Sequence, residues 1–287
     1  MNGQRIIVGY SGSQAACRAV DWAAAEAERT YTRLQIVYAY PIVYPIGWPG
    51  DYYAVIEMTQ AAERLADQLV AEIVAYARER TPGVDVSGLA VPGPAATTLL
   101  DLADATGSLL VVGNRGAGRI TNLLLGSVSQ HVATHAHVPI VVVRGRSAAT
   151  EGPIVVGIDR SASTDTALRL AFGAALARAT DVIAVRAYVP PARSRLPPSA
   201  VEAPERAILQ SSLAGWREKY PTVEVQGRLA IGSAAEVLIA MSHTAQLIVV
   251  GSRGHGAFTG LLLGSVGQQL MHHAECPVLI AHTPSPG

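Results

Sequence analysis

Lysine is nearly missing from this chain of 287 residues, because Lys219 is the only one in it. The P-loop of phosphoryl-transfer enzymes, GxxxxGK[ST], requires a lysine at the phosphates, and this motif occurs nowhere in the sequence. The chain also lacks a GxSxG nucleophile elbow and an acid and base pair that recurs along it. These absences exclude a P-loop kinase and predict a protein without dedicated catalysis.

Cysteine is almost as scarce as lysine. Cys17 falls in an expected helix and Cys276 lies directly before an expected last strand, so the two occupy unmatched places in the two halves of the chain. This pattern predicts neither a structural disulfide nor a metal knuckle.

Three histidines, His131, His135 and His137, are close together, and the first two share a helix face at i and i+4 spacing. The corresponding residues in the second half are Gln269, His273 and Glu275. A duplicated metal site would keep its ligands, and neither HExxH nor paired CxxC motifs are present. We therefore predict no metal site.

An excess of one charge and long apolar runs are also missing. The 22 Lys and Arg balance 22 Asp and Glu, and the basic residues are dispersed, which is unlike a nucleic-acid-binding surface. No run reaches the roughly 18 apolar residues that cross a bilayer, and the amino terminus does not resemble a signal peptide. We expect a cytosolic protein that binds neither nucleic acid nor membrane.

What the chain does contain is a duplication. The segment GNRGAGRITNLLLGS, which begins at Gly113, recurs as GSRGHGAFTGLLLGS from Gly251, 138 positions later. Halves of about 145 residues are close to the commonest domain size. We predict a first domain at residues 1–146, a linker rich in small and polar residues at 147–152, and a second domain at 153–287.

Each half alternates short β-branched runs with longer segments of helical period, such as residues 14–30 and 58–80, which is typical of βαβ units. The expected fold class is α/β, with two tandem doubly wound five-stranded parallel sheets of strand order 3-2-1-4-5. Such sheets bind ligands beyond the carboxyl ends of strands one and four. The expected strands are residues 5–10, 34–40, 84–91, 108–113 and 140–144, then 154–159, 182–188, 223–230, 247–251 and 278–282.

The repeated segment follows the fourth expected strand of each half. Glycine lets backbone N–H groups approach an anion without a Cβ in the way, and the Gly-Ser pair begins a helix whose amino end attracts phosphate. Glycines after a strand can also simply form a tight turn. Two copies in register at this edge of the sheet favour a phosphate site. The matched residues are Gly113, Gly116, Gly126 and Ser127, and Gly251, Gly254, Gly264 and Ser265.

The segment IVVGIDRSAS at residues 154–163, followed by G-x2-G-x9-G-S, resembles the universal stress protein family, and IVGYSGSQAA with the first glycine loop resembles a second copy. The resemblance covers nearly the whole chain and implies a tandem member with a Rossmann-like fold related to adenine nucleotide alpha hydrolases. It implies that ATP is bound, with Mg²⁺ held mainly by the phosphates, and that Asp159 holds the ribose. The phosphates would lie at the glycine loop and the helix start, at Gly251, Gly254, Gly264, Ser265 and Val266 in the second half and at Gly113, Gly116, Gly126, Ser127, Val128 and Ser129 in the first.

The first half departs from the family pattern, because Ser11 stands where the second half has Asp159. A serine cannot offer a carboxylate to two ribose hydroxyls, so we hypothesise that the second site binds nucleotide more tightly. Arg160 takes the usual glycine position of the family and can either reach a phosphate or crowd the entrance. Arg115 and Arg253 match within the loops, as phosphate ligands or as solvated arginines.

Aromatic residues gather after the second expected strand. They either form a lid that stacks on adenine or pack against one another or a partner domain. This cluster comprises Tyr40, Tyr44, Trp48, Tyr52 and Tyr53. Tyr40 and its counterpart Tyr188 are predicted to contact the nucleotide.

Three functions are considered for this fold. The first is an ATP-binding stress-response module whose conformation a partner senses, a role that the resemblance implies. The second is a nucleotide-free dimeric scaffold, in which the last strands at residues 140–144 and 278–282 pair between the two halves or between chains. The third is a slow ATPase. We expect the first, with a homodimer as the assembly.

Overall fold

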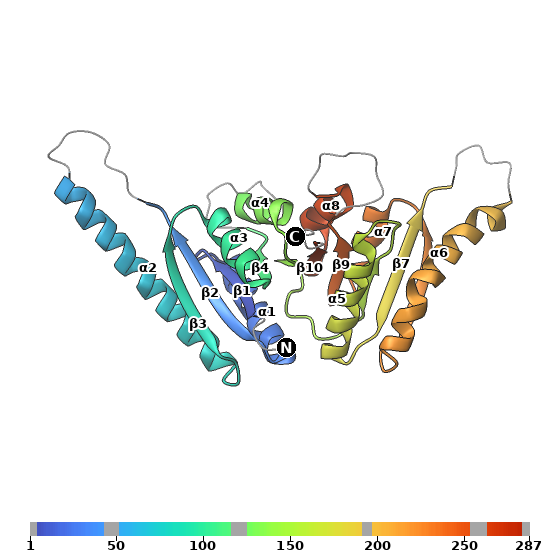
Figure 1. Ribbon diagram of the computed structural model, residues 1–287, viewed down its shortest axis with the longest axis horizontal. Coiled ribbons are helices and arrows are strands. Elements are labelled where there is room, and N and C mark those ends of the chain that lie inside the picture. The colour runs from blue at the N-terminus through green and yellow to red at the C-terminus, as the bar shows by residue number, and fades with distance from the viewer. Residues whose placement is uncertain (1–4, 43–51, 116–124, 191–196, 253–262, 283–287) are drawn as a thin grey trace. The chain divides into compact units, whose positions relative to one another are not determined.

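The computed structural model of the protein describes residues 5–42, 52–115, 125–190, 197–252 and 263–282. The chain divides into two compact units, Met1–Val132 and Ala133–Gly287, and each alternates strands with helices (Figure 1). The α/β class predicted from the sequence is confirmed.

Helices and strands follow each other in the order that the hydrophobic periodicity predicts. The first repeat contributes β1 (Arg5–Tyr10), α1 (Gln14–Thr30), β2 (Arg33–Tyr40), α2 (Tyr52–Arg80), β3 (Val86–Pro92), α3 (Ala95–Thr106), β4 (Leu109–Gly113), α4 (Ser127–His135) and β5 (Ile140–Val143). The second contributes β6 (Ile154–Gly157), α5 (Ser163–Arg178), β7 (Val182–Tyr188), α6 (Pro198–Lys219), β8 (Val225–Ile231), α7 (Ala234–Met241), β9 (Leu247–Gly251), α8 (Ser265–His273) and β10 (Val278–Ala281).

Four boundaries differ from the prediction by more than a residue. Strands β3 and β8 begin at Val86 and Val225, each two residues later than expected. The other two differences have a clear local reason. Helix α2 begins at Tyr52 rather than at residue 58, and the residues that open it beyond position 54 are mainly exposed, so no apolar stripe marks them. Strand β6 ends at Gly157, two residues early, because Asp159 binds the backbone and hydroxyl of Ser161 and leaves the extended conformation.

The strands of each unit form a parallel sheet. In the first unit the order is β3-β2-β1-β4, with β1 paired in parallel to both β2 and β4. In the second unit the order is β8-β7-β6-β9-β10, which is the predicted 3-2-1-4-5 arrangement. The winding therefore reverses between the first and fourth strands, where a ligand crevice is expected.

The last strand of the first repeat lies in the second unit. Strand β5 pairs antiparallel with β10, with Val142 opposite Val278 and Ile140 opposite Ile280. Both strands are fully buried. Strand β10 thus finds its pairing partner within the same chain, which is one of the two arrangements that the sequence left open.

Helices cover both faces of each sheet, as the strand register shows. In the first unit a Cβ on Gly9 would meet Leu99 of α3, whereas a Cβ on Gly88 would meet Val70 of α2. Gly9 is level with Val37 and Gly88 is level with Ile36, so the two directions alternate along β2. Helices α2 and α3 therefore pack on opposite faces.

The second unit repeats this arrangement. A Cβ on Gly157 would meet Leu238 of α7, and one on Gly227 would meet Leu209 of α6. Gly157 is level with Val185 and Gly227 with Ala184, which are neighbours on β7. Helices α6 and α7 lie on opposite faces.

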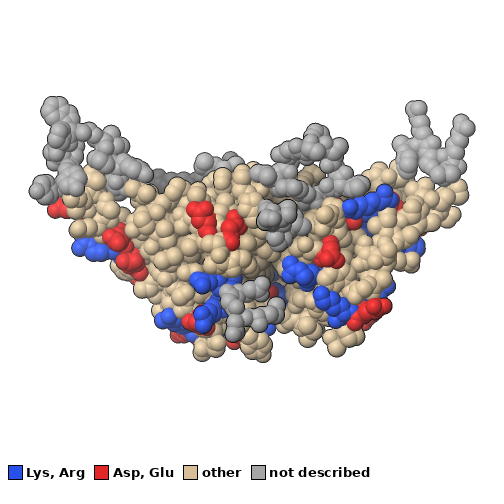
Figure 2. Space-filling view, in the orientation of Figure 1, with Lys and Arg blue, Asp and Glu red and all other residues tan. Residues whose placement is uncertain are grey.

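The surface and the helices give two further observations. On the part of the surface coloured in Figure 2, acidic and basic side chains are interspersed, and neither sign forms a broad patch. Among the helices in the described ranges, none combines the length and the apolar character needed to span a bilayer.

Replacing Gly88 by alanine tests the close packing of α2 on β3. The new Cβ would lie 2.3 Å from Val70 Cγ1 and 2.7 Å from Val74 Cγ2, so we expect Gly88→Ala to lower the free energy of unfolding by about 1–3 kcal/mol. Gly83→Ala is the matched control, because nothing lies within 4 Å of its Cβ position. Urea unfolding followed by circular dichroism measures both, and equal losses would contradict the packing described.

Candidate functional site

A cavity of about 450 Å³ opens in the first unit where β1 and β4 end. The sequence predicts a ligand crevice at this switch point. The cavity combines an apolar wall with the glycine-loop residues and the start of α4. It is lined by Gly9, Tyr10, Ser11, Ala16, Val37, Ala39, Ala95, Leu99, Val112, Gly113, Arg115, Leu125, Gly126, Ser127, Val128 and Ser129.

Close backbone packing forms the base of this cavity. A Cβ on Gly113 would lie 2.6 Å from the carbonyl oxygen of Ala15, so only glycine allows β4 to end against the first turn of α1. Ser13 caps α1 as predicted, because its Oγ accepts a hydrogen bond of 3.1 Å from the N–H of Ala16. The end of β1, the start of α1 and the end of β4 are thereby held together.

The start of α4 supplies the polar end of the cavity. The N–H of Gly126 donates to the carbonyl of Asn114 at 2.8 Å, so this predicted phosphate ligand uses its amide to close the loop. Ser129 is buried, and its hydroxyl donates to the carbonyl of Gly113 at 2.5 Å. No described residue accepts a hydrogen bond from the backbone N–H of Ser127 or Val128, which leaves two first-turn donors for an anion.

Arg115 is the single charged residue among those that line the cavity, and its side chain is exposed. Its carbonyl accepts a hydrogen bond of 3.4 Å from Ser13 Oγ, which ties the loop to the capped end of α1. Gly116, which was predicted beside it, lies outside the described residues.

The second repeat has the same loop closure. The N–H of Gly264 donates to the carbonyl of Ser252 at 2.8 Å, as Gly126 does to Asn114. Gly264 is the N-cap residue of α8, and Ser265 and Val266 form its first turn. Gly251 ends β9 at the same edge of the sheet. The predicted residues Arg253 and Gly254 lie outside the described residues.

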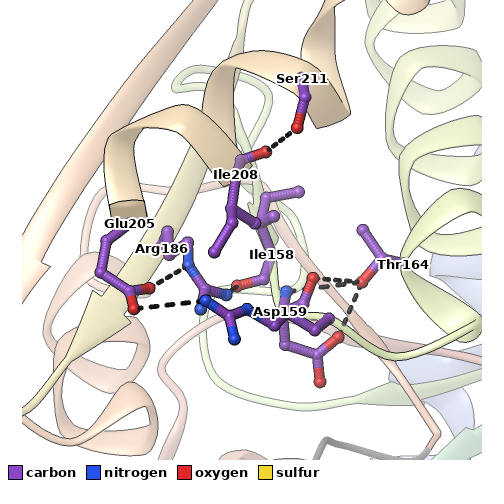
Figure 3. Close-up of polar contacts among 8 residues, drawn as sticks. Ile158, Asp159, Thr164, Arg186, Glu205, Ile208 and Ser211 are labelled. Carbon is purple, nitrogen blue, oxygen red and sulfur yellow. Dashed lines mark hydrogen bonds and ion pairs between the residues drawn. The ribbon is translucent and has the colours of Figure 1, made fainter. Parts of the chain in front are cut away.

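Asp159 occupies the position after β6 that Ser11 occupies after β1. Its Oδ1 accepts two hydrogen bonds from Ser161, from the N–H at 2.8 Å and from Oγ at 2.6 Å. It accepts a third from Oγ1 of Thr164 at 2.7 Å (Figure 3). No described residue donates to its Oδ2. The carboxylate is therefore fixed in orientation with one oxygen available to a ligand. Ser11 makes a single side-chain contact, with Ser13 Oγ at 3.1 Å.

An ionic network adjoins Asp159 on the α6 face of the sheet. Arg186 is buried on β7; its Nε donates to Glu205 Oε2 at 2.5 Å and its Nη1 to the carbonyl of Ile158 at 3.3 Å (Figure 3). The other carboxylate oxygen of Glu205 lies 3.9 Å from Nη2 of Arg160, the residue after Asp159. The network joins the site loop to α6.

The side chains of Tyr40 and Tyr188 point away from the crevice, contrary to the prediction. Val37 and Ala39 line the cavity, so the alternation along β2 turns Tyr40 toward α2. Burial raises the pKa of Tyr40, and the nearby carboxylate of Glu63 on α2 raises it further. Tyr188 is directed toward α6 in the same way; burial raises its pKa first, and then Glu202, to which it is hydrogen-bonded.

Several site residues were missed in the sequence. Ala39, Ala95 and Leu99 line the cavity, but small and apolar side chains look the same in a core. Arg186 gave a usable signal, because it is a charged residue inside the otherwise apolar strand VIAVRAY. Among the described residues, no group of three or more His, Cys, Asp and Glu side chains is arranged to hold a metal ion.

A model of the universal stress protein family matches residues 3–144 and 152–282. The chain belongs to the universal stress protein family. The resemblance predicted from the strand and loop motifs is thereby confirmed, including its tandem character. A universal stress protein of Mycolicibacterium smegmatis is 36% identical over 288 residues and covers 96% of both chains.

Two solved structures were compared with this chain. A universal stress protein from Archaeoglobus fulgidus DSM 4304 has a TM-score of 0.71 at 16% identity, covering 98% of this chain and 99% of its own, which shows a shared fold. A universal stress protein in complex with cAMP is 30% identical, covers 49% of this chain and 96% of its own, and has a TM-score of 0.35.

The matched positions Asp159 and Ser11 differ in how much structure each supports. Asp159→Ala removes the acceptor of three hydrogen bonds in the loop after β6, and we expect it to lower the free energy of unfolding by about 1–2 kcal/mol. Ser11→Ala removes one contact and should cost less than about 0.5 kcal/mol. Denaturant unfolding without nucleotide measures both, and a larger loss for Ser11→Ala would refute the assignment.

Proposed function

We propose that this universal stress protein binds adenine nucleotide, ATP in the first place, and acts as a binding and signalling module in a stress response without dedicated catalysis. The observation that carries the proposal is the cavity of the first unit, whose lining joins apolar side chains with the start of α4. Its volume of about 450 Å³ is typical of small-molecule sites.

The two ends of this cavity suit the two ends of a nucleotide. Val37, Ala39 and Leu99 offer an apolar surface of the kind that covers a planar base. The amides of Ser127 and Val128, at the positive end of α4, suit a phosphate. Arg115 adds the one formal positive charge of the lining.

Mg²⁺ has a supporting role in this proposal. The lining residues of the first cavity include no carboxylate, so a bound Mg²⁺ would be held by the nucleotide phosphates and by water. In the second unit Asp159 lies at the matched position, and its carboxylate suits a ribose diol. We propose on this ground that the second site binds nucleotide more tightly than the first.

Calorimetric titration with ATP and with adenosine tests the first site. The Asp159→Ala background weakens the second site, and within it Arg115→Ala should reduce ATP affinity about 3- to 10-fold and leave adenosine affinity unchanged, because only ATP carries phosphate charge. Arg64→Ala on α2 is the control, since this exposed arginine is not in the cavity lining. No binding of ATP, ADP or AMP at millimolar concentration would instead support the nucleotide-free scaffold.

Turnover of bound ATP should be slow. Among the described residues that line the cavity there is no carboxylate, histidine or lysine to act as a general base. We therefore expect phosphate release with Mg²⁺ to stay below about 1 s⁻¹. A malachite green assay at saturating ATP measures it, with heat-unfolded protein as the control for contamination. Sustained turnover above that rate would identify an ATPase.

A further inference from the structure

The first half of α6 is held to the second unit by polar contacts. The buried residues of this helix are Leu209, Leu213 and Trp216, so its apolar anchoring begins in its second half. Every residue at 198–208 is exposed or only half-buried. Pro204 also removes one backbone donor from the helix interior. Local opening of this half is therefore governed by a few ionic contacts.

Two carboxylates make those contacts. Glu202 pairs with Arg206 at 3.4 Å and is hydrogen-bonded to Tyr188 at the end of β7. Glu205 pairs with Arg186 at 2.5 Å and lies 3.9 Å from Arg160. Among these partners only Arg160 belongs to the loop that carries Asp159.

Arg186 and Arg160, the two arginines beside Glu205, differ in how firmly each is held. The Arg186 side chain is 10% exposed and also donates to the carbonyl of Ile158, so it is a fixed part of the unit. The Arg160 side chain is 48% exposed and its contact is long, so this pair contributes little and separates readily. Arg160 is thus a cation held loosely beside the proposed nucleotide site.

This arrangement belongs to the second repeat alone. Arg160 corresponds to Gly12 and Arg186 corresponds to Tyr38, whose ring lies 6.3 Å from that of Tyr10. Counted back from the matched prolines at positions 82 and 221, Glu205 corresponds to Ala66, a buried residue of α2. The first repeat carries an apolar and aromatic contact where the second carries three charges.

We propose that Glu205 is a positioning residue that holds Arg160 on α6 until an anionic ligand enters the second site. This inference rests on the proposed nucleotide binding. The phosphates of the ligand compete with Glu205 for the guanidinium of Arg160, and its departure removes one of the contacts that hold the first half of α6. Ligand binding on one face of the sheet thereby loosens the start of α6 on the other face.

Hydrogen exchange with mass spectrometry measures the helix start directly. ATP should speed exchange of the amides at residues 198–206 about 1.5- to 5-fold, which corresponds to the loss of one exposed ion pair. Arg160→Ala and Glu205→Gln should each produce this faster exchange without ligand, and ATP should then add nothing there. Arg169→Ala, which removes an exposed arginine of α5, is the control and should leave these amides unchanged.

The ATP affinity of the second site distinguishes a positioning role of Glu205 from a purely structural one. In an Arg115→Ala background that weakens the first site, Arg160→Ala should lower ATP affinity, whereas Glu205→Gln should raise it by releasing Arg160. Adenosine affinity should not change in either variant. Both variants break the Arg160–Glu205 contact, and Glu205→Gln also removes the charge that pairs with Arg186. A general loosening of the fold would shift ATP affinity in one direction for both.

The outcomes distinguish the inference from the proposed function. A chain that binds ATP but shows unchanged or slower exchange at residues 198–206 overturns the inference and leaves nucleotide binding intact. Shifts of ATP affinity in the same direction in both variants overturn it as well. Absence of ATP binding in the unmodified chain refutes the proposed function and, with it, the competition for Arg160.

Discussion

Alternation of side chains along parallel strands is the constraint on which the site depends. On β2 it turns Val37 and Ala39 toward the cavity and Tyr40 toward α2. On β7 the same rule turns Arg186 toward α6, where it meets Glu205. A single geometric rule thus separates a face that can hold a ligand from a face that carries charge. In the second unit the loop after β6 carries both Asp159 and Arg160, and Arg160 contacts Glu205 on the charged face.

The two repeats share their loop closure and differ in the residues around it. The N–H of Gly126 donates to the carbonyl of Asn114, and the N–H of Gly264 donates to the carbonyl of Ser252. These two amides therefore shape the loop and are not free for a ligand. Duplication has therefore preserved the scaffold of the crevice. The position after the first strand has diverged, from a serine with one contact to an aspartate that accepts three hydrogen bonds. This is the position at which the two proposed nucleotide sites differ most in their hydrogen bonding.

The sequence predicted the architecture well because periodicity and repeated glycines report local geometry. Strand β1, the cap at Ser13 and the strand order of the second unit follow from such signals. The apolar wall of the cavity did not, since Ala39 and Leu99 have the chemistry of any core residue, and their role comes from which elements meet. The partner of Arg186 lies 19 positions away on another element, so the strand sequence alone shows only a charge in need of a partner.

The pairing of β5 with β10 has a consequence for the evolution of the tandem chain. A gene fragment that encodes the first repeat would carry an apolar strand, IVVV, whose antiparallel neighbour β10 is encoded in the other half. Separation of the copies would leave that strand edge open to aggregation. Fusion makes this pairing intramolecular, so the effective concentration of the partner strand no longer depends on expression level.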